Sequence, residues 1–297
     1  MANIQQRVLT HIDGDIYGVA AYYTDNDRIQ HAVVATKDGS LYEIHWSRGA
    51  AASSPQKLAH FNGLVCLAGF FSPDDNYQKV IVGSDVGNLH EIYFHQPENP
   101  SFRSPLIHLK SVVGMRIGMA AFYTPDDNLR HAVVVDEDGE LHEAFWSPQE
   151  EPDAEDFATQ FDLKDITGIA GFYTPDDNAR NIIVALKDGL LYDVHYISKQ
   201  KTASTDFLTQ FDGGLVNVAA FFALDTNDRH IITLNAEGDL FDYARTAQSD
   251  HGKTQVASFS HIVDMAAYYS AYDSYRQIVV ATHDGNIHEV CYPQSGG

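Results

Sequence analysis

A glycine recurs six times along this chain, at intervals of 47 to 52 residues, and the copies align without a gap for more than twenty residues upstream of it. The six positions are Gly39, Gly87, Gly139, Gly189, Gly238 and Gly285. Self-similarity at such a period is typical of propellers, solenoids and other arrays in which each repeat is one supersecondary unit. The 297-residue chain is therefore predicted to fold as six copies of one unit.

The unit itself has the pattern of four β-strands. Its first apolar run, such as IYGVAAYYT at 16–24, is too short for a buried helix and predicts a strand buried on both faces. A pair of small residues, Ala20 and Ala21 in the first copy, lies at the centre of this run in every copy and places the strand innermost, where units converge. Two further runs joined by an Asp-Gly turn predict a hairpin. A more variable segment holds a fourth, outer strand, expected near 56–61 and at 157–161.

The ends of the chain predict how the array closes. The sixth copy stops at Tyr292, after its third strand, and the N-terminal segment at 6–13 resembles the missing fourth strand. A ring closed by pairing both ends removes open sheet edges. We therefore predict one all-β domain over 1–297, a six-bladed β-propeller of four-stranded antiparallel blades. The blade cores are expected near 16–46, 64–94, 116–146, 166–196, 215–245 and 262–292.

Composition limits the partners and the compartment. Lys and Arg number 19 and Asp and Glu 41, a net charge of −22. Such a surface repels phosphate backbones and anionic headgroups, which argues against nucleic acid and membrane surfaces as partners. Cys66 and Cys291 fall in different copies, so no disulfide is expected. With no signal-peptide pattern at the N-terminus, we expect the cytoplasm by default, or secretion without a classical signal.

Three polar or aromatic positions recur around each glycine. The position four residues after it is always acidic, and the position seven residues after it is aromatic in five copies and Arg245 in the fifth; the position eight residues before it is mostly polar. The acids are Glu43, Glu91, Glu143, Asp193, Asp242 and Glu289; the aromatics are Trp46, Phe94, Trp146, Tyr196 and Tyr292; the earlier positions are His31, Lys79, His131, Asn181, His230 and Gln277. The acid shares a strand face with a core Leu or Ile, so it must be partly covered and should have a hydrogen-bond donor as partner.

These positions resemble the G-x-I-x-E-x-x-W pattern of the fungal fucose-binding lectin family. The best matches run from Gly39 to Trp46, from Gly139 to Trp146 and from Gly285 to Tyr292. The resemblance implies a six-bladed propeller with sugars between adjacent blades, where the glutamate accepts sugar hydroxyl bonds, an arginine twelve residues earlier donates and the aromatic packs on the sugar.

The arginine of that pattern is not matched. His31 lies twelve residues before Glu43, and arginine occurs one position earlier, in four copies only. These arginines are Arg130, Arg180, Arg229 and Arg276. A one-residue offset turns a side chain to the opposite face of a strand, so the resemblance does not extend to fucose specificity.

Two interpretations of the repeated acids stay open: they either clamp neighbouring blades together or bind a ligand. The same choice applies to the aromatics, as packing or as sugar platforms. The Asp-rich turns, such as 124–128, have type I turn chemistry and no EF-hand spacing, and the histidines show no metal-ligand spacing. We therefore expect neither a metal nor a cofactor.

The favoured hypothesis is a non-enzymatic, multivalent carbohydrate-binding module that recognises glycans or glycoconjugates between its blades. The predicted ligand-binding residues are Glu43, Trp46, Glu91, Glu143, Trp146, Asp193, Tyr196, Glu289, Tyr292, His31 and His131. A protein-interaction scaffold is the first alternative. The second is an enzyme at the central axis, where Asn217, Asp264 and Arg116 are the polar exceptions on the innermost strands.

Overall fold

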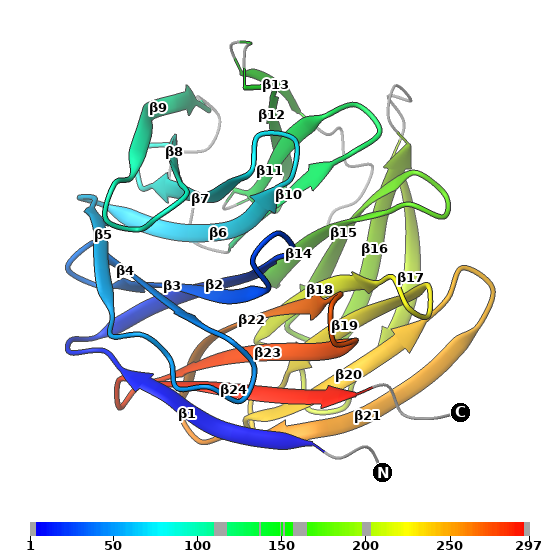
Figure 1. Ribbon diagram of the computed structural model, residues 1–297. Helices are drawn as coiled ribbons and strands as arrows, with labels where there is room; N and C mark the ends of the chain where they lie inside the picture. The colour runs from blue at the N-terminus through cyan, green and yellow to red at the C-terminus, as the bar shows by residue number, and fades with distance from the viewer. Residues whose placement is uncertain are drawn as a thin grey trace.

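The computed structural model describes residues 4–109, 118–136, 138–148, 150, 152–156, 165–197 and 203–293. Within these ranges, 24 strands form six four-stranded antiparallel sheets that follow one another around a ring (Figure 1). The predicted six-bladed β-propeller is confirmed. No helix in the described part of the chain is long and apolar enough to cross a membrane.

Each blade consists of an innermost strand, two middle strands and an outer strand. Blade 1 holds β2 (Ile16–Thr24), β3 (Ile29–Thr36), β4 (Ser40–Trp46) and β5 (Gln56–His60). Blade 2 holds β6 (Leu64–Ser72), β7 (Tyr77–Ser84), β8 (Asn88–Phe94) and β9 (Ser101–His108). Blade 3 holds β10 (Met119–Thr124), β11 (Leu129–Val135), β12 (Leu141–Trp146) and β13 (Asp153–Asp156).

The second half of the ring repeats this order. Blade 4 holds β14 (Ile166–Thr174), β15 (Ala179–Leu186), β16 (Leu190–Ile197) and β17 (Ser204–Gln210). Blade 5 holds β18 (Asn217–Ala223), β19 (Asp228–Leu234), β20 (Asp239–Arg245) and β21 (Asp250–Ser258). Blade 6 holds β22 (Ile262–Ser270), β23 (Tyr275–Thr282), β24 (Asn286–Pro293) and β1 (Gln5–His11). In the third copy the outer strand expected at 157–161 lies outside the described residues, and β13 precedes it.

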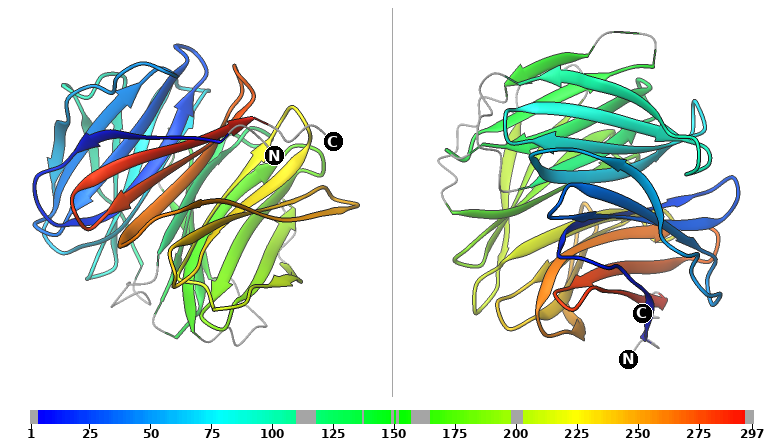
Figure 2. Two further views of the ribbon diagram at one scale, coloured as in Figure 1. Left: turned by 90° about the horizontal axis from the view of Figure 1, so that it is seen from below. Right: turned by 90° about the vertical axis from the view of Figure 1, so that its left-hand side faces the viewer.

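The two ends of the chain close the ring, as predicted. Strand β1 runs antiparallel to β24, from the pair Gln5 and Cys291 to the pair His11 and Asn286, with a bulge between Val8 and Thr10. The two strands lie side by side at one edge of the molecule (Figure 2). The first strand of the chain, which is seven residues long, therefore completes the last blade.

Glycine is required at two kinds of position. Gly39 has a φ of +87°, and a Cβ there would lie 2.0 Å from the carbonyl oxygen of Phe61, so no other residue fits this hairpin. At the axis, a Cβ on Gly171 would lie 2.9 Å from the Phe122 ring and 3.0 Å from the Cβ of Ala120. This close approach of β14 to β10 explains why the innermost strands carry small residues.

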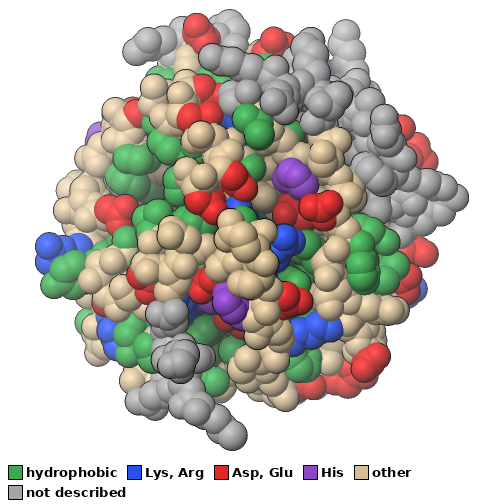
Figure 3. All heavy atoms as spheres, turned by 90° about the vertical axis from the view of Figure 1, so that its right-hand side faces the viewer, with side chains coloured by type: hydrophobic (Ala, Val, Ile, Leu, Met, Phe, Trp, Pro, Cys, Tyr) green, Lys and Arg blue, Asp and Glu red, His purple; other side chains and the backbone are tan. Residues whose placement is uncertain are grey.

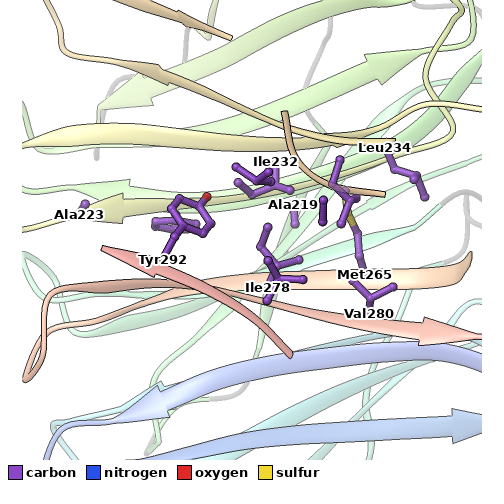
Figure 4. Close-up of a cluster of buried hydrophobic side chains, with 13 residues drawn as sticks. Ala219, Ala223, Ile232, Leu234, Met265, Ile278, Val280 and Tyr292 are labelled. Atoms are coloured by element: carbon purple, nitrogen blue, oxygen red, sulfur yellow. The ribbon is translucent and has the colours of Figure 1, made fainter. Parts of the chain in front are cut away.

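The apolar core lies between blades and not within a separate interior. Between blades 5 and 6, Ala219, Ile232 and Leu234 pack against Met265, Ile278, Val280 and Tyr292 (Figure 4). Burying one such aliphatic side chain contributes about 1.5–3 kcal/mol. The aromatic seven residues after the glycine therefore belongs to the interface between blades.

The outside of the molecule matches the acidic composition. One face shows Asp and Glu side chains spread among hydrophobic and uncharged ones, with fewer Lys and Arg (Figure 3). Both cysteines, Cys66 and Cys291, are buried and free, as predicted.

Candidate functional site

The repeated acid links two blades, and Glu143 shows the arrangement most clearly. Its Oε1 lies 2.7 Å from His131 Nδ1 of the same blade and accepts a hydrogen bond from the Tyr196 hydroxyl of blade 4. The Phe122 ring stacks on His131 with ring centroids 5.1 Å apart. All four side chains are buried, so they form a polar link inside an apolar interface.

The same link recurs around the ring with different donors. Asp242 lies 2.9 Å from His230 Nδ1 and accepts from the Tyr292 hydroxyl at 3.0 Å. Glu91 accepts from Trp146 Nε1 of blade 3 at 3.2 Å, with Lys79 Nζ at 3.7 Å. Each acid thus joins its own blade to the next one along the chain.

The repeated acids of the first and last blades have other donors. Glu289 accepts from Trp46 Nε1 of blade 1 at 2.7 Å and from Arg7 Nε at 2.6 Å. Glu43 faces Phe94, which has no polar atom, and lies 2.9 Å from His31 Nδ1 and 3.2 Å from His45 Nδ1 instead. Both carboxylates are buried and held by protein groups.

Asp193 departs from this arrangement. Its Oδ1 is buried and has no hydrogen-bond partner among the described residues. Asn181, at the position of His131, donates to Thr174 Oγ1 at 3.0 Å instead, and Arg245 of blade 5 replaces the aromatic. Burial raises the pKa of Asp193 from 3.8 to about 6.

The structure therefore brings the predicted site residues together, but in closed interfaces. The acids Glu43, Glu91, Glu143, Asp193 and Glu289, the histidines His31 and His131, and the aromatics Trp46, Trp146, Tyr196 and Tyr292 are each at most 8% exposed. In all but Asp193 the acid already has protein partners, which favours the clamp interpretation. A ligand-binding role for these eleven residues stays a prediction.

The offset arginines form a second ring of links. Arg130 donates to both carboxylate oxygens of Asp74, at 2.7 and 2.8 Å, and Arg276 lies 3.0 Å from Asp225. Arg180 donates to Asp127 Oδ2, and Arg229 donates to Asp177 Oδ2 at 2.6 Å. In each case a buried arginine of one blade binds the Asp-rich turn of the preceding blade. These turns have the expected Asp–backbone bonds and also serve as the partners of the arginines.

Glutamine replaces this arginine in blades 1 and 2, and there a tyrosine of the preceding blade bonds the glutamine. The Tyr268 hydroxyl donates to Gln30 at 3.1 Å, and the Tyr22 hydroxyl donates to Gln78 at 3.3 Å. The four blades that precede an arginine have phenylalanine at this place: Phe70, Phe122, Phe172 and Phe221. Sequence reasoning missed this pairing, although the exchange of Tyr with Phe and of Gln with Arg is visible across the six copies.

A cleft of about 850 Å³ lies between blades 6 and 1, where Gln30 occupies the position of the repeated arginine and Arg48 binds the Asp-rich turn instead. Its walls include Gln5, Gln6 and Arg7 of β1, the turn at 27–28, the loop at 47–49 and the turn at 270–273. Between blades 1 and 2 the arginine is also absent, but there Asn26 Nδ2 donates to Asn76 Oδ1 at 2.7 Å and joins the two turns directly. We name the first of these hollows the closure cleft.

The closure cleft contains polar atoms without partners and an exposed aromatic ring. Arg7 Nη2 and Asp273 Oδ1 are buried and have no hydrogen-bond partner among the described residues. The ring of Tyr272 is 64% exposed, and the guanidinium of Arg28 lies 3.8 Å above its centroid. Arg48 binds the other oxygen of Asp273 at 3.3 Å. Sequence reasoning assigned none of these residues to a site. Arg7 lies in the closing strand and Arg48 in a loop that does not repeat, whereas Arg28, Tyr272 and Asp273 lie in the repeated turns, which were interpreted as turn chemistry alone.

The central axis holds a smaller channel of about 320 Å³. Asp264 there accepts hydrogen bonds from the Val19 and Met265 amides, both at 2.8 Å, and from Asn217 Nδ2 at 2.5 Å. Burial raises its pKa from 3.8 to about 6. Arg116, the third polar exception, lies outside the described residues. Asp264 and Asn217 thus bond to each other and to the backbone.

One cluster could offer metal ligands. Atoms of Asp136, Glu140 and His142 lie within 4.8 Å of one another. Asp136 Oδ1 accepts the amides of Asp138 and Glu140, and its Oδ2 lies 3.0 Å from His142 Nε2. Asp136 therefore ties together the turn of a β-hairpin, as Thr36 and Thr282 do in blades 1 and 6.

No protein-family model and no curated protein matches the sequence. Solved structures match in fold. The Aleuria aurantia lectin in complex with α-methyl-L-fucoside superposes with a TM-score of 0.71 at 11% identity, over 97% of this chain and 94% of that one. AofleA from Arthrobotrys oligospora gives a TM-score of 0.71 at 10% identity, over 99% and 87%. A lectin from Burkholderia pseudomallei gives 0.62 at 16% identity, over 100% and 82%.

These likenesses confirm the predicted resemblance in fold to the fungal fucose-binding lectins. At 10–16% identity they show the six-bladed architecture alone. What this chain binds has to be argued from its own residues.

Proposed function

We propose that the protein binds carbohydrate, and that the closure cleft is its binding site. The observation that carries this is the combination, in one cleft of about 850 Å³, of an exposed tyrosine ring with an unpartnered donor and an unpartnered acceptor. Sugar hydroxyls both donate and accept, so a bound sugar can offer an acceptor to Arg7 Nη2 and a donor to Asp273 Oδ1. Aromatic rings such as Tyr272 pack on the apolar face of a sugar.

The fold neighbours support a binding role. Several of them are lectins, and three of these structures are complexes with a fucoside or a fucose-containing sugar. Along the described part of the axis, Asp264 and Asn217 are engaged with each other and with backbone amides, which supports binding rather than catalysis.

The number of sites differs from the multivalent hypothesis. Five of the six repeated acids are bonded to protein groups, and a sugar would have to displace those bonds at a cost of about 1–3 kcal/mol for each buried group left unsatisfied. The closure cleft already holds unpartnered atoms. We therefore assign one principal site per chain.

A glycan array on the purified protein tests this function. The variant Tyr272→Ala should lose binding, because it removes the exposed ring, which contacts blade 1 through the guanidinium of Arg28. Phe207→Ala is the matched control, since that ring is 57% exposed on β17 of blade 4, away from the closure cleft. An array with no saturable signal for folded wild-type protein, or equal losses in both variants, would contradict the proposal.

A further inference from the structure

Arginine side chains line the closure cleft of this acidic molecule, and this bears on the class of saccharide that it takes. Three of the 19 Lys and Arg residues line it: Arg7, Arg28 and Arg48. Three carboxylates line it too, those of Asp27, Asp273 and Glu289. The formal charges balance, so the ligand class depends on which groups are already occupied.

The carboxylates are largely occupied by protein donors. Both oxygens of Glu289 accept hydrogen bonds, from Trp46 Nε1 and from Arg7 Nε. Asp27 Oδ1 accepts the Ile29 amide and the Thr24 hydroxyl within its own turn. Only Asp273 presents a buried oxygen without a partner to the cleft within the described residues.

Two of the three arginines also have partners, since Arg7 pairs with Glu289 and Arg48 with Asp273, and this leaves Arg28. Among the described residues, no carboxylate forms an ion pair with Arg28, whose guanidinium lies over the Tyr272 ring. A guanidinium over an aromatic ring can still donate from its N–H groups, and a pair of these groups matches the two oxygens of a carboxylate. Arg7 adds a buried Nη2 that lacks a partner.

We propose that the saccharide bound in the closure cleft carries a carboxylate, as uronic and sialic acids do. Arg28 pairs with the carboxylate, and the sugar hydroxyls bond Arg7 Nη2 and Asp273 Oδ1. This inference rests on the proposed carbohydrate function and goes beyond it, because the neutral sugars named for the fold neighbours offer hydroxyl acceptors but no negative charge to the guanidinium of Arg28, with which no described carboxylate pairs.

Titration calorimetry with two probes tests the charge of the ligand: a disaccharide ending in glucuronic acid and its carboxyl-reduced, neutral counterpart. We expect the acidic disaccharide to bind on the order of ten-fold or more tightly, as charge-assisted bonds do. Its affinity should fall with added salt, because the pair is near the surface. Equal affinity for the two probes would overturn the inference and leave a neutral-sugar site.

Variants of Arg28 test whether this residue is the source of the preference for the acidic disaccharide. Arg28→Gln should remove most of the preference for the acidic disaccharide, and Arg28→Lys should restore only part of it, because an ammonium lacks the guanidinium fork. Lys187→Gln, an equal change of charge at an exposed position of blade 4, should leave the preference intact. A preference that survives Arg28→Gln would overturn the assignment of the carboxylate to Arg28.

The outcomes separate this inference from the proposed function. If no saccharide binds folded protein, the carbohydrate function itself is wrong. If only neutral sugars bind, that function stands and the acidic class is wrong. Tighter binding of a sulfated disaccharide than of the glucuronate probe would overturn the choice of a carboxylate.

Discussion

Replacing Asp193 with asparagine should stabilise the protein at neutral pH, which is the reverse of what removing a buried charge does at the other blades. Asp193 is 5% exposed and its Oδ1 has no partner within the described residues, so the folded state holds a poorly compensated charge. Burial raises its pKa from 3.8 to about 6. A difference of about two pKa units corresponds to about 3 kcal/mol, an upper limit because the asparagine amide also needs partners.

The sign of the pH dependence follows from that raised pKa. Between about pH 4 and pH 6 the folded state keeps a proton on Asp193 that the unfolded state has released, so this residue makes the protein less stable as the pH rises through that window. The advantage of Asp193→Asn should therefore be largest at pH 7.5, about 1–3 kcal/mol, and should vanish near pH 4. Urea unfolding of both proteins at the two pH values measures it.

Asp242→Asn is the matched control, because Asp242 occupies the same position in blade 5 but is held by His230 and Tyr292. Its replacement weakens two hydrogen bonds to a buried charge and should lower the free energy of unfolding at pH 7.5 by about 1–3 kcal/mol. If Asp193→Asn destabilised the protein at pH 7.5 as Asp242→Asn does, the account of an uncompensated carboxylate would be refuted.

Two further predictions concern the links between blades. Tyr196→Phe removes the hydroxyl that bonds buried Glu143 and should lower the free energy of unfolding, measured by thermal unfolding, by about 1–3 kcal/mol. The phenyl ring itself should still pack, because Phe94 is buried at the same position of blade 2. Unchanged stability of this variant would mean that the bond does not hold the blades. Arg276→Gln breaks the buried pair with Asp225 and should cost about 3–5 kcal/mol, and adding Phe221→Tyr should recover part of it by recreating the Tyr–Gln bond seen at Gln78. If the double variant lost as much free energy of unfolding as the two single variants together, or more, the same thermal unfolding would contradict the idea that Tyr–Gln can replace Phe–Arg.

The repeats made the architecture predictable. The six glycines, the small residues of the innermost strands and the resemblance of 6–13 to an outer strand rest on patterns that recur, so the ring and its closure followed from the sequence. The outer strand expected at 157–161 lies outside the described residues, so that prediction stays open. Local periodicity thus sufficed wherever the copies constrain one another.

The candidate site was harder to predict, because it depends on what does not repeat. That the acids need donors was predictable, but the donors come from two blades, some fifty residues apart. Comparing Tyr with Gln and Phe with Arg across the copies would have paired only the second ring of links. The closure cleft requires Arg7 of the N-terminal strand to meet the loop at 47–49 and the turn at 270–273. Nothing in the spacing of those segments indicates that they converge.

The number of saccharides bound by each chain tests the central claim most directly. Titration calorimetry with the saccharide selected on the array should give one site per chain, and Tyr272→Ala should abolish it while Phe207→Ala does not. Binding of several equivalent saccharides per chain that persists in Tyr272→Ala would contradict this account, because it would place ligands at the repeated acids between the blades.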